Sequence, residues 1–261
     1  MRFKLVLVPL STKTYIPFNY QYALSAVIYH KLAQASKDYA SFLHQKGYAQ
    51  NEHSKHFKLF SYSNLTGKFK ADKSALQLQD KETGFILGCH MPEFAENIVK
   101  GIFANQRISI GDKTAQADFE VQQINAVADL SFTGTQKHTL QLLSPLAVGK
   151  KNERGNYDYL SPADPYFLPL LKNNLSDKLL TAYPGKTFDF ELGANLFPGK
   201  LKSRLVSIRA GTDQETRVKG FMGFTLSLRG RAEVLNMALC AGLGQYNGVG
   251  FGCVGMNDGF L

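Results

Sequence analysis

The spacing of hydrophobic residues in the first half of the chain predicts strands and amphipathic helices. Residues 2–9 form an apolar, strand-like run, whereas Leu24, Ile28 and Leu32 recur close to the 3.6-residue period of a helix. Pro92 stands where a further helix would begin, a position that proline favours. The predicted strands are 2–9, 58–64, 67–79, 84–90 and two around Ile108 and Val121, and the predicted helices are 19–35, 37–45 and 92–104.

The second half repeats this order of elements without repeating the sequence. The predicted strands are 140–148, 186–196, 200–210, 217–229 and 249–256, and the predicted helices are 165–180 and 231–243. Strand, helix, strands, helix, strand is the order of the ferredoxin-like fold. We therefore predict an α+β protein of two tandem ferredoxin-like (RRM-like) domains, residues 1–127 and 128–261, joined near residues 128–136.

The predicted strand at 217–229 places cations and an aromatic residue on one face. Lys219, Phe221 and Arg229 alternate with apolar residues there. Such a face could stack and neutralise single-stranded RNA, although an ordinary solvent-facing strand has the same pattern.

The chain is basic along its whole length. Its net charge is +9, and Lys and Arg outnumber Asp and Glu by 15 to 10 up to residue 127 and by 15 to 11 beyond it. An even spread suits a polyanion that crosses the whole molecule, but a solvated surface with a modest basic excess fits as well.

Cysteine and histidine positions argue against disulfides and metals. The three cysteines are widely spaced without a C-x-x-C pair, and His53 and His56 lack further convergent ligands. The N-terminus leads straight into a strand, and no apolar run approaches the roughly 20 residues that span a bilayer. We expect no metal, no other cofactor, no membrane partner and a cytoplasmic location.

The most unusual segment is glycine-rich and runs from Gly242 to Gly255, with six glycines in 14 residues. Within it, Gly250, Gly252 and Gly255 match the spacing of the dinucleotide fingerprint, but a predicted helix precedes them and few residues follow. The fingerprint needs a strand before it and a helix after it, so we reject a Rossmann site. Two interpretations stay open: a loop that presents backbone N–H groups to phosphates, or a turn required for close packing.

At this segment the chain resembles the RAMP superfamily of CRISPR-associated RNA-binding proteins, whose hallmark is a glycine-rich loop after the last helix. It is most similar to the superfamily's repeat-processing endoribonucleases, the sixth Cas family. The matching stretches lie in the same order along essentially the whole chain: Met1-Arg2-Phe3, Val8-Pro9, Pro17-Phe18-Asn19-Tyr20-Gln21-Tyr22, Leu43-His44, Lys58-Leu59-Phe60-Ser61-Tyr62-Ser63, Leu143-Ser144-Pro145-Leu146-Ala147-Val148 and Tyr246-Asn247-Gly248-Val249-Gly250-Phe251-Gly252.

This resemblance implies metal-free cleavage within the repeats of CRISPR precursor RNA, leaving 2′,3′-cyclic phosphate and 5′-hydroxyl ends. It also implies the catalytic residues, which correspond here to Tyr29, His44 and Lys58. Extra residues around Tyr48–Lys55 make Lys55 an alternative to Lys58, and His30 is an alternative to His44.

The implied residue types suit attack by the neighbouring 2′-hydroxyl of the RNA. Histidine can act as base or acid near neutral pH, and lysine can stabilise the charge of the phosphorane. Tyrosine can orient the RNA or donate a proton. The nucleophile belongs to the RNA, so the protein need not supply one.

Basic residues outside this set and three loop glycines are candidates for RNA contacts: Lys150, Lys151, Arg154, Lys202, Arg204, Arg217, Lys219, Gly248, Gly250 and Gly252. The expected partner is CRISPR repeat RNA, with a CRISPR effector complex and a homodimer as further possibilities. A non-catalytic RAMP subunit that binds guide RNA is the alternative function. An RRM-type RNA-binding protein is disfavoured, because the sequence has no K/R-G-F/Y-G/A-F-V-x-F/Y stretch.

Overall fold

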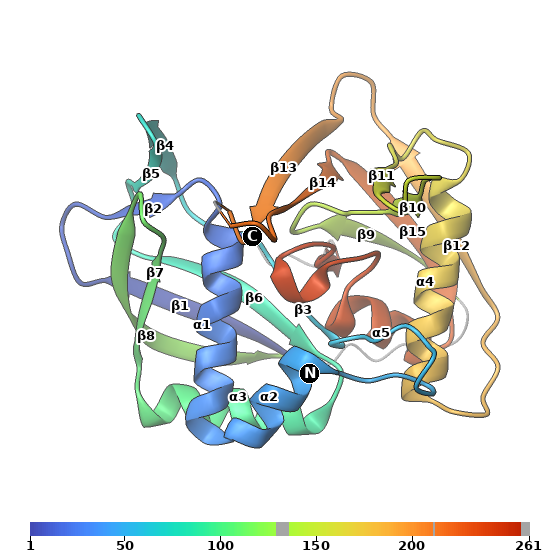
Figure 1. The fold of residues 1–261 in the computed structure, drawn as a ribbon, viewed down its shortest axis with the longest axis horizontal. Coiled ribbons are helices and arrows are strands. Elements are labelled where there is room, and N and C mark those ends of the chain that lie inside the picture. The colour runs from blue at the N-terminus through green and yellow to red at the C-terminus, as the bar shows by residue number, and fades with distance from the viewer. Residues whose placement is uncertain (129–135, 211, 257–261) are drawn as a thin grey trace.

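The computed structural model describes residues 1–128, 136–210 and 212–256 and contains two α+β units side by side (Figure 1). The predicted junction near 128–136 therefore lies mostly outside the described residues. No described helix is both long and apolar enough to cross a membrane.

The N-terminal unit is built on a five-stranded antiparallel sheet in the order β3-β6-β1-β8-β7. Strands β3, β6, β1 and β8 lie in the ferredoxin-like order, with β1 between β6 and β8. Strand β7 is added at the edge of the sheet, beside β8. The elements are β1 (Arg2–Pro9), β2 (Tyr15–Pro17), α1 (Tyr20–Ala35), α2 (Lys37–Gln45), β3 (Phe60–Tyr62), β4 (Phe69–Asp72), β5 (Ala75–Leu78), β6 (Thr83–Cys89), α3 (Pro92–Ala104), β7 (Arg107–Gly111) and β8 (Gln116–Val127).

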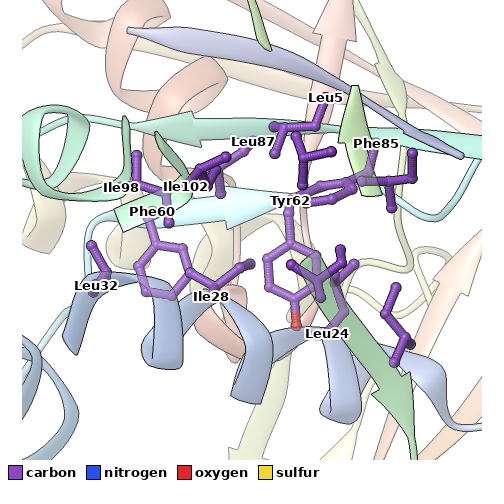
Figure 2. Close-up of a cluster of buried hydrophobic side chains, with 14 of the residues drawn as sticks. Leu5, Leu24, Ile28, Leu32, Phe60, Tyr62, Phe85, Leu87, Ile98 and Ile102 are labelled. Carbon is purple, nitrogen blue, oxygen red and sulfur yellow. The ribbon is translucent and has the colours of Figure 1, made fainter. Parts of the chain in front are cut away.

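Helices α1 and α3 bury their apolar faces against this sheet. Leu24, Ile28 and Leu32 of α1 point at the aromatic rings of Phe60 and Tyr62 on β3 (Figure 2). All five side chains are at most 2% exposed, so each contributes roughly 1.5–3 kcal/mol through burial. This core fixes α1 over the strand that follows Lys58.

The C-terminal unit has a four-stranded antiparallel sheet in the order β12-β15-β9-β16, which is again ferredoxin-like. The hairpin of β13 and β14 is inserted between β12 and β15. The elements are β9 (Lys137–Leu142), β10 (Gly149–Lys151), β11 (Tyr157–Tyr159), α4 (Phe167–Ala182), β12 (Phe190–Leu196), β13 (Lys202–Ile208), β14 (Thr216–Met222), β15 (Phe224–Gly230), α5 (Ala232–Ala241), the 3-10 turn η1 (Asn247–Val249) and β16 (Val254–Met256).

These two sheets and their helices confirm the predicted α+β fold with tandem ferredoxin-like units. The first sheet ends at Val127 and the second begins at Lys137. The exact boundary between residues 127 and 128 stays a prediction.

Two long strands predicted from the sequence are wrong, because the chain turns inside each of them. Gly223, with φ of +86°, divides 217–229 into β14 and β15, which pair with different strands. Phe221 is then only 7% exposed and lies in the core, so it offers no ring for RNA to stack on, which removes the first of the two interpretations of that strand. Likewise, Lys73 at φ of +47° folds 67–79 into the β4–β5 hairpin.

The segment between α2 and β3 ties the two units together. Phe57 and Leu59 precede β3 of the first unit, yet their side chains are buried in the core of the second. Helix α5 also packs on β6: a β-carbon at Gly88 would lie 2.7 Å from the carbonyl oxygen of Cys240. The segment before β3 and the strand β6 are therefore packed directly against the C-terminal unit.

Candidate active site

Helix α2 presents His44 to solvent at its C-terminal end. Ser36 begins the helix, and its hydroxyl accepts a hydrogen bond from the Tyr39 N–H at 3.2 Å, which satisfies one of the free donors of the first turn. Tyr39 and Leu43 are buried on the opposite face, so the side chain of His44 is left exposed. Burial of its neighbours, not of the histidine itself, fixes the backbone position of His44.

Lys58 returns to His44 because the chain between them closes on itself. Tyr48 and Phe57 exchange two backbone hydrogen bonds, at 2.8 and 2.7 Å, which close off the extra residues as a loop. Gly47, with φ of +74°, makes the turn that this closure requires. The Lys58 ammonium then donates to the carbonyl oxygen of His44 at 2.8 Å, and partial burial lowers the pKa of Lys58.

Tyr29 lies beside His44 although fifteen positions separate them. It projects from α1, and its ring meets the imidazole edge to face with centroids 5.2 Å apart. It makes a similar contact with Phe60 at 5.9 Å, which anchors the ring on β3. Burial raises the pKa of Tyr29 above the usual value, so its hydroxyl stays protonated at neutral pH.

The glycine-rich loop packs against α1 and against Lys58. The hydroxyl of Ser25 on α1 donates to the carbonyl oxygen of Gly248 at 2.7 Å. A β-carbon at Gly248 would lie 3.4 Å from the stem of Lys58, so the loop backbone rests directly on that side chain. Gly250 and Gly252 are buried, with Gly250 against Gln21 and Tyr62, which favours the close-packing interpretation for these two glycines.

Together these elements enclose a pocket of about 780 Å³, called the central pocket below. Tyr29, His44 and Lys58 all line it, as does Gly248. Sequence reasoning missed other residues in its wall, among them Ser25, Arg209 and Tyr246. Tyr246 had a recognisable context, because it sits within the glycine-rich segment. In the structure it holds a φ of +61°, which is costly for a residue with a side chain.

A buried lysine forms hydrogen bonds with the glycine-rich loop. The ammonium of Lys178 on α4 donates to the carbonyl oxygens of Gly242 and Gly244 and to the side-chain oxygen of Asn247, at 2.8, 3.0 and 2.6 Å. The amide of Asn247 in turn donates to the carbonyl oxygens of Leu243 and Phe251. Burial lowers the pKa of Lys178 to about 7. This network fixes the loop that forms one wall of the central pocket.

The predicted RNA-contacting cations fall into two groups. Lys150 and Lys151 are exposed on β10 beside the central pocket, with Arg154 on the adjoining turn. The others lie on the β13–β14 hairpin, where Arg204 donates to the carbonyl oxygen of Phe18 at 2.7 Å and so joins the hairpin to the N-terminal unit. None of Lys202, Arg204, Arg217 and Lys219 lines the central pocket.

The alternative residues lie elsewhere or have other contacts. His30 lines a separate hollow on the far side of α1 and does not reach His44's pocket. Lys55 lines the central pocket, but its ammonium forms an exposed ion pair with Asp177 at 2.7 Å. Among the described residues, no group of three or more His, Cys, Asp and Glu side chains could hold a metal ion.

Comparison with known proteins accounts for nearly the whole chain. The family model described as "CRISPR-associated protein Cas6, N-terminal" matches residues 15–125, and "CRISPR associated protein Cas6, C-terminal" matches residues 128–256. The two models therefore fall on the two ferredoxin-like units.

Two curated relatives and a solved structure are similar to this chain over most of their lengths. The chain is 27% identical to the CRISPR-associated endoribonuclease Cas6 of Pyrococcus furiosus, covering 97% of this chain and 89% of that protein. It is 26% identical to the CRISPR-associated endoribonuclease Cas6 1 of Methanocaldococcus jannaschii, covering 92% and 87%. A solved structure named "CRISPR associated protein Cas6" superimposes with a TM-score of 0.72 and 26% identity over 99% of both chains.

Proposed function

The chain belongs to the Cas6 family, and we propose from this membership and from the central pocket that it is an endoribonuclease that cuts CRISPR precursor RNA within its repeats. The observation that carries this proposal is the convergence of Tyr29, His44 and Lys58 beneath the glycine-rich loop. These residues come from α1, α2 and the segment before β3. A non-catalytic RNA-binding subunit would not need a tyrosine, a histidine and a lysine in one pocket.

The proposed reaction is transfer of the phosphate to the neighbouring 2′-oxygen. A base takes the 2′-hydroxyl proton, the 2′-oxygen attacks phosphorus, and the bond to the 5′-oxygen breaks as that oxygen receives a proton. The products are a 2′,3′-cyclic phosphate and a 5′-hydroxyl. Because the RNA supplies the nucleophile, the pocket has only to move protons and stabilise negative charge.

Each residue has a role that follows from its surroundings. His44 is exposed to the pocket, and imidazole exchanges protons near neutral pH, so it serves as base or acid. Lys58 lies against the carbonyl of His44 and places a cation where the phosphorane forms. Tyr29 stays protonated because of its burial, so it can hold the imidazole edge-on and donate a hydrogen bond to the RNA.

The RNA-binding surface proposed here joins the central pocket to the cations of β10. Lys150, Lys151 and Arg154 would meet phosphates next to the cut. Neutralising one such contact should weaken binding of all sequences about equally and reduce the salt slope by about 1. Assembly with an effector complex or with a second copy of the chain stays a prediction.

The test is cleavage of the cognate repeat RNA in excess EDTA by the wild type, His44→Ala and His30→Ala. We expect His44→Ala to cut roughly 10²–10⁴-fold more slowly while it binds the RNA as before. His30→Ala is the matched control, since this histidine is also exposed but lies in another hollow, and it should cut normally. The wild type should leave cyclic-phosphate ends.

Two results would contradict the proposal in different ways. A wild type that binds repeat RNA tightly and never cuts it would establish the non-catalytic subunit function instead. If His44→Ala cuts as fast as the wild type, the histidine assignment is wrong, and His56, which also lines the central pocket, becomes the next residue to replace.

A further inference from the structure

A second pocket opens from the side of the central one. It has a volume of about 430 Å³ and lies between the β10–β11 hairpin and α4. Five residues line both pockets, so the two form one continuous surface: Lys55, Tyr157, Asn174, Gly244 and Gln245. An RNA strand that lies across the central pocket therefore also has access to this side pocket.

The side pocket combines an aromatic surface with a cationic rim. Tyr157 on β11 is 39% exposed and so offers aromatic surface to a ligand. Lys150 and Lys151 of the neighbouring strand line the same pocket, and the Lys151 ammonium lies 5.9 Å from the centre of the Tyr157 ring. The buried side chain of Leu171 forms part of the apolar floor.

An unsatisfied amide marks the boundary between the pockets. The side-chain oxygen of Asn174, in the middle of α4, is buried and has no hydrogen-bond partner among the described residues. A buried acceptor without a donor costs about 1–3 kcal/mol, so the fold alone gives no reason for this asparagine. A phosphate has acceptors only and cannot satisfy that oxygen. The edge of a nucleobase offers both donors and acceptors and can pair with an amide after rotation about its χ2 bond.

We propose that the side pocket binds one nucleotide next to the scissile phosphate, with its base stacked on Tyr157 and its edge paired with the Asn174 amide. The lysines of β10 hold the phosphates at the rim. The pocket volume lies within the range of small-ligand sites, and base stacking on an aromatic side chain contributes affinity for every base. This inference rests on the proposed function only in taking RNA as the ligand.

The test is a binding cycle that does not depend on cleavage. Repeat RNA with a 2′-deoxy substitution at the cut cannot be cleaved, and single abasic sites are placed in turn at each position flanking it. At one position, the abasic site should weaken binding by the wild type by roughly tenfold, from the magnitude of base–aromatic stacking. Tyr157→Ala should bind the intact RNA about tenfold more weakly and show no further loss at that position.

Matched variants separate this contact from general effects. Tyr157→Phe keeps the ring and should behave as the wild type. Tyr166→Ala removes another exposed tyrosine, whose ring lies 4.1 Å from the Lys150 ammonium but outside both pockets. The loss of RNA affinity caused by Tyr166→Ala should simply add to the loss caused by each abasic site. Asn174→Ala should reduce discrimination between bases at the position that couples to Tyr157.

The outcomes distinguish this inference from the proposed function. Additive effects of Tyr157→Ala at all positions would overturn the nucleotide site, even if the wild type cuts the RNA normally. If Tyr157→Ala and one abasic site are coupled but the wild type never cuts the RNA, the nucleotide site is supported and the proposed endoribonuclease activity is refuted.

Discussion

Replacing Lys178 by methionine should change how the stability of the protein depends on pH. The lysine is 2% exposed, and no described carboxylate forms an ion pair with it. Within the part of the chain that the structure describes, its ammonium donates to neutral oxygens alone, those of Gly242, Gly244 and Asn247. Methionine has a similar length and does not titrate, so the substitution removes the buried charge while it largely keeps the volume.

The magnitude follows from the pKa of the buried ammonium. Burial lowers this pKa from 10.5 to about 7 in the folded protein. Between these two pH values the unfolded chain binds more protons than the folded one, so the free energy of unfolding rises with pH. At 1.36 kcal/mol per pH unit, titration of Lys178 raises the free energy of unfolding by about 5 kcal/mol in all. None of this increase is present below pH 7, and all of it is present above pH 10.5.

The assay is urea unfolding of the wild type and Lys178→Met at several pH values. The free energy of unfolding of the wild type should rise, relative to that of the variant, by about 1.4 kcal/mol for each pH unit in that window. Other groups titrate in both proteins and cancel in the difference. Lys172→Met, at an exposed lysine of the same helix, should leave a difference that does not vary with pH.

A flat difference for Lys178→Met would refute this reasoning. It would mean that the three oxygen acceptors hold the proton on the ammonium and return its pKa to the ordinary value. An –NH3⁺ group has three donors and a neutral amine has fewer, so this is the physical effect that opposes burial.

Two glycine substitutions test the close packing around the site. Gly252→Ala should destabilise the protein by roughly 2–5 kcal/mol, because φ is +69° and the new methyl group would overlap with the carbonyl oxygen of Leu243; chemical denaturation measures this, and a loss below about 1 kcal/mol would show that the loop can shift. Gly101→Ala should cost roughly 1–3 kcal/mol despite the better helix propensity of alanine, because its methyl group would overlap with the Lys31 carbonyl on α1. An unchanged melting temperature for Gly101→Ala would mean that α1 and α3 can separate without loss.

The sequence by itself determined the order of elements and hence the fold class. Burial of Leu24, Ile28 and Leu32 on one face of α1 follows from their spacing, since a helix must cover its apolar face. The predicted bounds of α2 and α3 agree with the structure, because Ser36 and Pro92 begin these helices by local interactions. Such features depend only on neighbours along the chain.

A partial signal was present for Lys178 and was overlooked. Leu171, Leu175, Lys178 and Leu179 follow the helical period, so the lysine stands on the apolar face of α4. Periodicity locates a residue on the buried face of a helix. It does not reveal that carbonyl oxygens of a loop more than sixty residues away receive its donors.

Only the tertiary structure decided where the strands end and which residues meet. The turn at Gly223 moves Phe221 into the core, since β14 pairs with β13 while β15 joins another sheet. The Tyr48–Phe57 closure brings Lys58 back to His44, and packing of α1 on β3 places Tyr29 beside both. These contacts join distant parts of the chain through burial and backbone pairing, and no spacing along the sequence encodes them.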